Sequence, residues 1–405
     1  VASCFTTRPN SRISVLAISL SSSLLALTRP DGLLFAVISS AIIMAEARST
    51  PTRRRVTVFR FALPLVLPGI HVLWRSSFYG EWLPNTYYAK QVAAWPQSGV
   101  RYLTSFLLEY GLWFWGGLAL GCLGVILRAG PFEYRTALRA PGQMTRALVL
   151  IAIFAHLSYY TLIIGGDHFE YRVYSYLPAL WLVATAWLTN RSVSIGAMEA
   201  GRGILVSLLV VLLSWPIPWT YWTKARRLST REETFNLVIP MADALPPGLG
   251  WYGKLFDSTQ SWLIAGHAVG KRRREHQIFH QAQLAEYALP RVVGNIEPGD
   301  YPILATGSVG VPGWILRHVN IIDVWGLNDW VVARNPVLPE RNRRMAHDRR
   351  PPTGYVECFR PNVKTIDGNV VVQHRALPLT EEDIQSCEAI YRNQIMRTSG
   401  IGPGQ

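Results

Sequence analysis

Residues 203–221 read GILVSLLVVLLSWPIPWTY, and residues 109–127 read EYGLWFWGGLALGCLGVIL. Each run is close to the length of about 20 residues that an α-helix needs to cross the hydrocarbon core of a membrane. Further apolar stretches fill the same half of the chain, at residues 13–28, 32–47, 57–74, 147–165 and 173–189. The sequence therefore predicts a polytopic α-helical membrane protein with about seven helical segments.

The first two apolar stretches are shorter than a full span, and they meet at Arg29-Pro30-Asp31-Gly32. Two arrangements fit this pattern. The stretches form a tight hairpin, or they are partly embedded helices broken by Pro30 and Gly32. A broken backbone at membrane depth persists only where protein or a wet cavity covers it. The sequence leaves both arrangements open.

Composition divides the chain into two parts. Charged residues make up 16% of the 405 residues, against about 25% in soluble domains, and this deficit is confined to the first half. We predict a transmembrane domain over residues 1–222 and a small α/β domain over residues 223–405. In the second domain we expect helices at 229–245 and 257–288, and strands at 303–305, 319–322 and 355–359.

Arginines mark the orientation of the predicted helices. They gather in three alternate loops, which follow the stretches 32–47, 109–127 and 173–189. Basic loops remain in the cytoplasm, so the other loops and residues 223–405 are predicted to lie outside it. The net charge of +14 is then largely a topology signal and gives little support to nucleic-acid binding. Cys358 and Cys387 could pair if their domain is extracytoplasmic, or remain two thiols; the sequence leaves this open.

Three polar loops fall on the predicted outer side: LTRPDG at 27–32, FYGEWLPNTYYAK at 78–90 and GGDHFEYR at 165–172. Each places a carboxylate near a cation, and the second and third are also rich in aromatic rings. Charged groups at a membrane boundary are costly and are usually retained for function. A carboxylate can accept the proton of an acceptor hydroxyl, and Arg or Lys can hold a departing phosphate. These residue types suit sugar transfer from a lipid phosphate.

A structural interpretation of the same loops is about equally good for any single residue. Arg29 and Asp31 can simply pair with each other, and the Tyr and Trp rings can serve as anchors at the interface. Further along, Asp323 follows an apolar strand in the run DVWGLND at 323–329. This loop either forms an Asx-type turn that caps the next helix or contributes to an acceptor groove. Residues 306–310, TGSVG, lack the lysine of a phosphate-binding loop and predict a turn.

The three outer loops, the run DVWGLND followed by Val332-Ala333-Arg334, and the run AHDRRPPTGY at 346–355 resemble one family when taken together. They are similar to bacterial GT-C membrane glycosyltransferases related to the mycobacterial terminal arabinofuranosyltransferase of cell-wall arabinan. The resemblance extends over about residues 24–360, in the same order and on the same predicted side.

The resemblance implies transfer of a sugar, such as the pentose arabinofuranose, from a polyprenyl-phosphate donor to a cell-envelope glycan. It also implies a multi-pass protein of the bacterial plasma membrane with an extracytoplasmic C-terminal domain. GT-C enzymes usually carry a key acidic residue in the first outer loop. The chain opens with Val1 and is expected to be a fragment that begins beyond that loop, so the principal base is expected to be missing and the activity of the fragment is left open.

The candidate residues are assigned by role. The supporting catalytic candidates are Asp31, Asp167 and His168. The donor-phosphate candidates are Arg29, Lys90 and Arg172. The sugar or acceptor candidates are Glu81, Asn85, Tyr88, Asp323 and Asp329. No cofactor or metal site is assigned because no zinc-ligand spacing is present, although a requirement for a divalent cation is left open.

A second functional class is a transporter or flippase of lipid-linked glycans. Such proteins carry internal repeats with broken helices in matching halves, and this sequence shows no such repeat. An envelope scaffold is a third class, but it would not need three charged aromatic loops on one face. The enzyme interpretation is therefore favoured.

Overall fold

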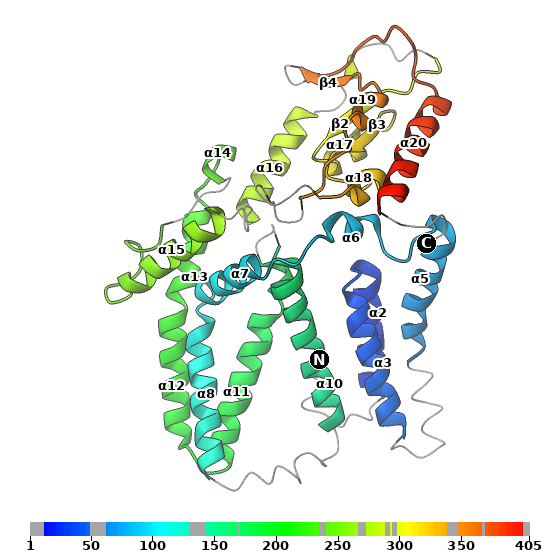
Figure 1. Ribbon diagram of the computed structural model, residues 1–405. Coiled ribbons are helices and arrows are strands. Elements are labelled where there is room, and N and C mark those ends of the chain that lie inside the picture. Colours follow the sequence, from blue (N-terminus) through cyan, green and yellow to red (C-terminus); the bar gives the residue numbers. More distant parts are fainter. Residues whose placement is uncertain are drawn as a thin grey trace. The chain divides into compact units, whose positions relative to one another are not determined.

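The computed structural model describes residues 12–48, 62–129, 143–167, 171–234, 240–265, 273–287, 292–293, 298–337, 343, 347–366 and 369–399 (Figure 1). The described chain falls into two compact units. Unit 1 holds residues 1–84, 117–160 and 182–207, and unit 2 holds 85–116, 161–181 and 208–405. The predicted domain boundary at residue 222 is not tested by this division and stays a prediction.

Three helices among the described residues are long and apolar enough to cross a membrane. They are Leu112–Ala129 (α8), Met144–Ile164, and Ala200–Ala225. The second contains α10 (Gln143–Ser158) and a π-helical turn, Tyr159–Ile164. The third joins α12 (Ala200–Ser214) to α13 (Pro216–Ala225). All three overlap predicted apolar stretches, so the chain is a helical membrane protein.

The other predicted segments are also helical where they are described. Two are shorter apolar helices, α2 (Arg12–Thr28) and α3 (Gly32–Arg48). The stretch 57–74 begins outside the described residues and continues into a 3-10 turn, Leu63–Leu65, and α5 (Val66–Tyr79). The stretch 173–189 corresponds to α11 (Leu177–Ser194). A total of seven crossing segments stays a prediction.

Within unit 1, α2 and α3 pack against each other as a tight hairpin, which is one of the two arrangements that the sequence left open. The turn is compact because the amide of Gly32 donates to the carbonyl of Arg29. A Cβ atom at Gly32 would lie 2.3 Å from the carbonyl oxygen of Leu25, so only glycine fits there. Helix α10 packs against α3 in the same unit.

The helical part of unit 2 is built on α7 (Pro96–Glu109) and α15 (Gly250–Ala265), which pack together. Their shared apolar core includes Leu108, Ile217 and Phe256, so the first half of α13 also belongs to it. In the sequence, the short helix α14 (Arg231–Thr234) precedes α15, and α16 (Arg273–Glu286) follows it. The predicted helix at 229–245 is therefore wrong over most of its described length, and 257–288 is divided between α15 and α16.

The α/β part of unit 2 holds two small sheets. Strands β2 (Ile303–Thr306) and β3 (Asn320–Asp323) pair in parallel, which confirms the strands expected at 303–305 and 319–322. The second sheet has the order β1-β5-β4. Its strands are β1 (Val292–Val293), β4 (Val363–Ile366) and β5 (Asn369–Val372). The α/β part also contains four helices: α17 (Gly310–Ile315), α18 (Trp330–Arg334), α19 (Tyr355–Cys358) and α20 (Glu381–Ser399).

The strand expected at 355–359 is wrong, because α19 occupies this segment. Tyr355 and Phe359 are four residues apart, the helical spacing that brings side chains onto one face, and their rings lie 5.0 Å apart in the buried core. Gly354 begins the helix with φ 81°, a conformation that favours glycine. Cys358 and Cys387 form a disulfide that joins α19 to α20.

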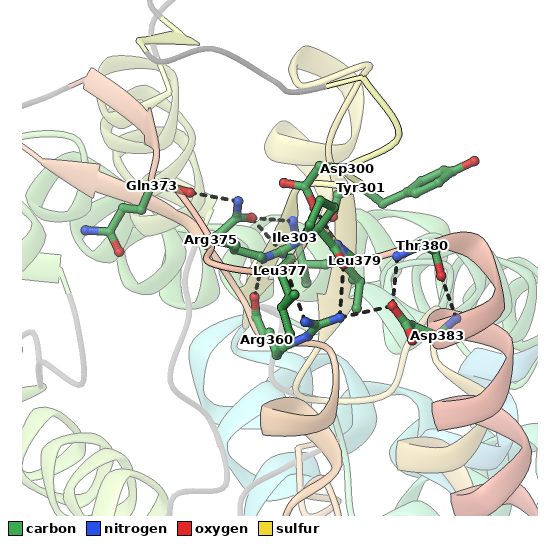
Figure 2. A network of polar contacts seen from close by, with 12 residues as sticks. Asp300, Tyr301, Ile303, Arg360, Gln373, Arg375, Leu377, Leu379, Thr380 and Asp383 are labelled. Carbon is green, nitrogen blue, oxygen red and sulfur yellow. Dashed lines mark hydrogen bonds and ion pairs between the residues drawn. The ribbon is translucent and has the colours of Figure 1, made fainter.

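A buried polar network fixes the C-terminal segment to β2 (Figure 2). Arg375 donates to Asp300 (Nη1 to Oδ1, 2.7 Å), to Asn362 (Nη2 to Oδ1, 2.7 Å) and to the carbonyl of Arg360 (2.8 Å). Asp300 also accepts from the amide of Leu379. The charged side chains of Arg375 and Asp300 are largely shielded from water, so each is stabilised mainly by the opposite charge of the other.

Removing one partner of this pair should destabilise the α/β part strongly. For Arg375→Ala we expect a loss of about 3–5 kcal/mol in the free energy of unfolding, because Asp300 would remain buried and unpaired. The exposed Arg397→Ala on α20 is the control and should change it by less than about 0.5 kcal/mol. Pulse proteolysis in urea, followed on fragments from residues 298–399, measures both. Equal midpoints for the two variants would contradict a stabilising role of the network.

Candidate functional site

The first predicted loop forms a four-residue polar cluster in unit 1. Arg29 donates two hydrogen bonds to Asp31, from Nε to Oδ1 at 2.9 Å and from Nη2 to Oδ2 at 3.0 Å. Asp31 Oδ2 also accepts from the hydroxyl of Tyr160 at 2.9 Å and lies 3.2 Å from Nε2 of His156. His156 and Tyr160 are one helical turn apart, and the packing of α10 on α3 brings both to the hairpin turn.

This environment keeps Asp31 charged. Burial disfavours the ionised carboxylate, but hydrogen bonds from His156 and Arg29 outweigh it and hold the pKa of Asp31 well below its ordinary value. A carboxylate with so low a proton affinity is a weak general base. Its geometry instead suits orienting the guanidinium of Arg29, whose Nη2 also donates to the Tyr160 hydroxyl at 3.0 Å.

The third predicted loop makes a similar pair in unit 2. Arg172 donates through Nε to Asp167 Oδ2 and through Nη2 to Oδ1 at 3.3 Å. Gly166 precedes the pair with φ 107°, and a Cβ atom there would lie 2.7 Å from the Tyr102 ring, so the close approach requires glycine. His168 lies outside the described residues.

The two loops contain the same arrangement, in which the carboxylate of a largely buried aspartate forms an ion pair with a more exposed arginine. The side chains of Asp31 and Asp167 are 16% and 6% exposed, whereas those of Arg29 and Arg172 are 37% and 39% exposed. Each guanidinium is thus oriented by a carboxylate, and more than a third of each arginine side chain is exposed. Oriented, accessible guanidinium groups are well suited to bidentate recognition of phosphate oxygens.

The second predicted loop docks onto DVWGLND within unit 2. Helix α6 (Asn85–Lys90) packs against α18, as Figure 1 shows. The side-chain amide of Asn85 donates to the carbonyls of Gly326 and Asp329, both at 2.8 Å, and accepts from Arg334 Nη1 at 2.9 Å. The guanidinium of Arg334 also lies 4.0 Å from the centre of the Tyr88 ring.

The carboxylates of DVWGLND are used to shape the loop. Asp323 is buried and accepts from the amides of Trp325 and Leu327. Asp329 caps α18 by accepting from the amide of Val332 at 2.8 Å and from the Tyr355 hydroxyl at 2.7 Å. Burial raises the pKa of Asp329 above its ordinary value despite these hydrogen bonds. This geometry fits the turn-and-cap interpretation, and an acceptor-binding role for the two residues stays a prediction.

The run AHDRRPPTGY joins the same region. Arg349 Nη2 donates to the carbonyl of Gln91 at 2.7 Å, just beyond α6. The guanidinium of Arg350 lies 3.9 Å from the centre of the Trp325 ring, and the His347 ring meets the same indole edge-on at 5.0 Å. Three of the motifs noted in the sequence are therefore held together inside unit 2.

The structure pairs Arg29 with Asp31 and Arg172 with Asp167, and it links Asn85 to the loop containing Asp329 and Tyr88 to Arg334 of α18. Arg29, Asp31 and Glu81 belong to unit 1, while Lys90, Asp167 and Arg172 belong to unit 2. A joint donor site thus stays a prediction. Among the described residues, no group of three His, Cys, Asp or Glu could hold a metal ion.

Sequence reasoning missed His156, Tyr160 and Arg334. The signal for the first two was present, since a histidine inside an apolar run is costly in a membrane and points to a polar partner. Arg334 stands in the run that follows DVWGLND, but nothing local indicated its partners, because its contacts with Asn85 and Tyr88 join segments about 250 residues apart.

Comparison with known proteins gives one informative similarity. The chain is 27% identical, over 367 residues, to the terminal beta-(1->2)-arabinofuranosyltransferase of Corynebacterium glutamicum; the matched region covers 82% of this chain and 50% of that protein. No family model matches the chain, and no solved structure matches it. The chain thus spans about half the length of a distant relative that is an arabinofuranosyltransferase.

Proposed function

We propose that this protein transfers a sugar, a pentose such as arabinofuranose, from a polyprenyl-phosphate donor to a cell-envelope glycan. The similarity to an arabinofuranosyltransferase supports glycosyl transfer to a glycan. The candidate membrane-spanning helices are compatible with a donor carried by a lipid, because polar loops at the ends of such helices are expected to lie near lipid head groups.

The observation that carries the proposal is that two ion pairs, Arg29–Asp31 and Arg172–Asp167, each orient a partly exposed arginine. In the reaction, an acceptor hydroxyl attacks the anomeric carbon, the bond from that carbon to the phosphate oxygen breaks, and polyprenyl phosphate leaves with the electron pair. Negative charge builds on the leaving phosphate, and oriented cations stabilise it. Arg29 and Arg172, each oriented by its own aspartate, are the candidates for such cations, and Lys90 is a further candidate.

The acceptor proton must pass to a base. His168 remains a candidate for it, whereas Asp167 is paired with Arg172 as Asp31 is with Arg29 and is assigned to hold that arginine. Asp31 is assigned to hold Arg29, because its bonds to His156, Tyr160 and Arg29 lower its affinity for a proton. Glu81, Asn85 and Tyr88 are assigned to the sugar side, where Asn85 fixes the loop at 326–329 and Tyr88 contacts Arg334.

We assign the protein to the bacterial plasma membrane with its C-terminal part outside the cytoplasm. The disulfide between Cys358 and Cys387 supports this side, since disulfides persist in oxidising compartments.

Donor recognition can be tested by native mass spectrometry on the whole chain in lipid nanodiscs. Decaprenyl phosphate should remain bound under conditions that release decaprenol, because only the phosphate can engage the guanidinium groups. Arg29→Ala should narrow this difference, whereas Arg202→Ala, which removes an exposed pair with Glu199, should not. Equal retention of the two lipids would contradict the assignment of a phosphate site.

A further inference from the structure

Helix α13 carries a row of exposed tryptophans at the end of a membrane span. Trp215, Trp219 and Trp222 are all exposed, and their rings follow one another at 6.3 Å and 5.1 Å. A helix needs about 20 residues to cross the hydrocarbon core. Counted from Ala200, where the span begins, that length ends close to Trp219. The row therefore lies where tryptophan is enriched, at the boundary between acyl chains and head groups.

The beginning of α8 lies at the same level as this row. The indole nitrogen of Trp115 donates to the hydroxyl of Ser214 at 3.0 Å, so the first turn of α8 is beside the last turn of α12. Trp113, two residues earlier, is partly exposed. Two antiparallel spans thus place their tryptophans at one membrane boundary.

Helix α15 is attached at this boundary. Its Trp251 ring lies 6.4 Å from the Trp113 ring, and the hydroxyl of Tyr252 donates to the carbonyl of Leu108 at the end of α7. One face of α15, with Tyr252, Phe256 and Leu263, is buried against the rest of unit 2. The helix is thereby held beside the ends of the spans.

The opposite face of α15 is exposed and has two edges. Successive residues turn by about 100°, so Trp251, Leu255 and Trp262 lie within about 40° of one another. All three are exposed. The neighbouring edge of the same exposed face is polar and carries Lys254, Ser258 and Ser261. An apolar edge beside a polar edge is the pattern of a helix that lies in the plane of a membrane interface.

We propose that α15 is an interfacial helix whose Trp251, Leu255 and Trp262 edge is buried in the head-group and acyl boundary of the bilayer. The occupant of this face is phospholipid, because the face continues the aromatic boundary formed by Trp113 and the α13 row. This helix fixes the depth of unit 2 in the membrane. The inference depends on the membrane spans and is independent of the proposed reaction.

The test compares spin labels on the two edges of the one helix. Cys4 and Cys122 are replaced by serine, the pair Cys358–Cys387 is kept, and a nitroxide is attached at Leu255→Cys or Ser261→Cys in the whole chain in nanodiscs. Leu208→Cys, exposed in the middle of a span, provides the reference for a lipid-buried label. Collision rates are measured with oxygen, which concentrates in lipid, and with a water-soluble nickel chelate.

The label at Leu255 should collide with oxygen several-fold more, relative to the nickel chelate, than the label at Ser261, and should approach the label at Leu208. Equal, water-like accessibility at Leu255 and Ser261 would overturn the proposal. Exclusion of both reagents from Leu255 would also overturn it, because a second protein surface would then cover the face. The substituted side chains are exposed, so neither change should prevent folding.

Discussion

Replacing Arg29 or Arg172 with alanine is expected to reduce the rate of sugar transfer by about 10²–10³-fold, the usual effect of removing one preorganised donor to developing negative charge. The reduction should fall mainly on kcat, because charge on the phosphate grows as the sugar bond breaks. Arg→Lys at either position should recover part of the rate. Lysine retains the charge but loses the fork that matches two phosphate oxygens.

Arg202→Ala is the matched control, since Arg202 forms an exposed pair with Glu199 on α12 and should leave the rate unchanged. Membrane content of each variant, measured by immunoblot, separates lost activity from lost protein. Equal losses in the Arg29→Ala and Arg202→Ala variants would show that arginine removal acts through general membrane insertion. The assigned donor role would then be abandoned.

The second large effect concerns the side of the membrane on which the C-terminal part lies. A phosphatase reporter, active only outside the cytoplasm, fused after residue 230 should be fully active, and a cytoplasmic reporter at the same place should be silent. The physical reason is the arginine content of the three alternate loops, which holds them in the cytoplasm. Fusions after residue 196, in the loop between α11 and α12, are the control and should give the opposite pattern.

The disulfide provides an independent test of the side of the membrane on which the C-terminal part lies. Cys358 and Cys387 should resist a maleimide reagent until a reductant is added. A silent phosphatase after residue 230, together with freely reactive thiols at both positions, would place the C-terminal part in the cytoplasm. The outer-face assignment of the polar loops would be lost with it.

The sequence was most informative where one local property decides the outcome. Apolar length predicted the three long spans, and strands at 303–305 and 319–322 followed from short β-rich runs. The spacing in Arg29-Pro30-Asp31 suggested the ion pair that the structure contains. It could not reveal that His156 and Tyr160 complete the cluster, because that depends on α10 packing against α3.

Tertiary context decided the remaining cases. The segment at 355–359 resembles a strand in composition, but Gly354 and the buried pair of Tyr355 and Phe359 favour a helical turn. The carboxylates of Asp323 and Asp329 were candidates for ligand binding as well as for turn formation, and only the hydrogen-bond partners distinguish these geometries. Such partners are set by the folded backbone.

The most direct test of the central proposal is transfer itself, measured in membranes of the native host. A radiolabelled polyprenyl-phosphate pentose is supplied to membranes depleted of this protein and then restored with the native form or with Arg29→Ala. We expect the native form to move label into envelope glycan and Arg29→Ala to fail to do so. Glycan labelling that is unchanged by depletion, together with donor lipid retained on the cytoplasmic leaflet, would contradict it and indicate a transporter of lipid-linked sugar.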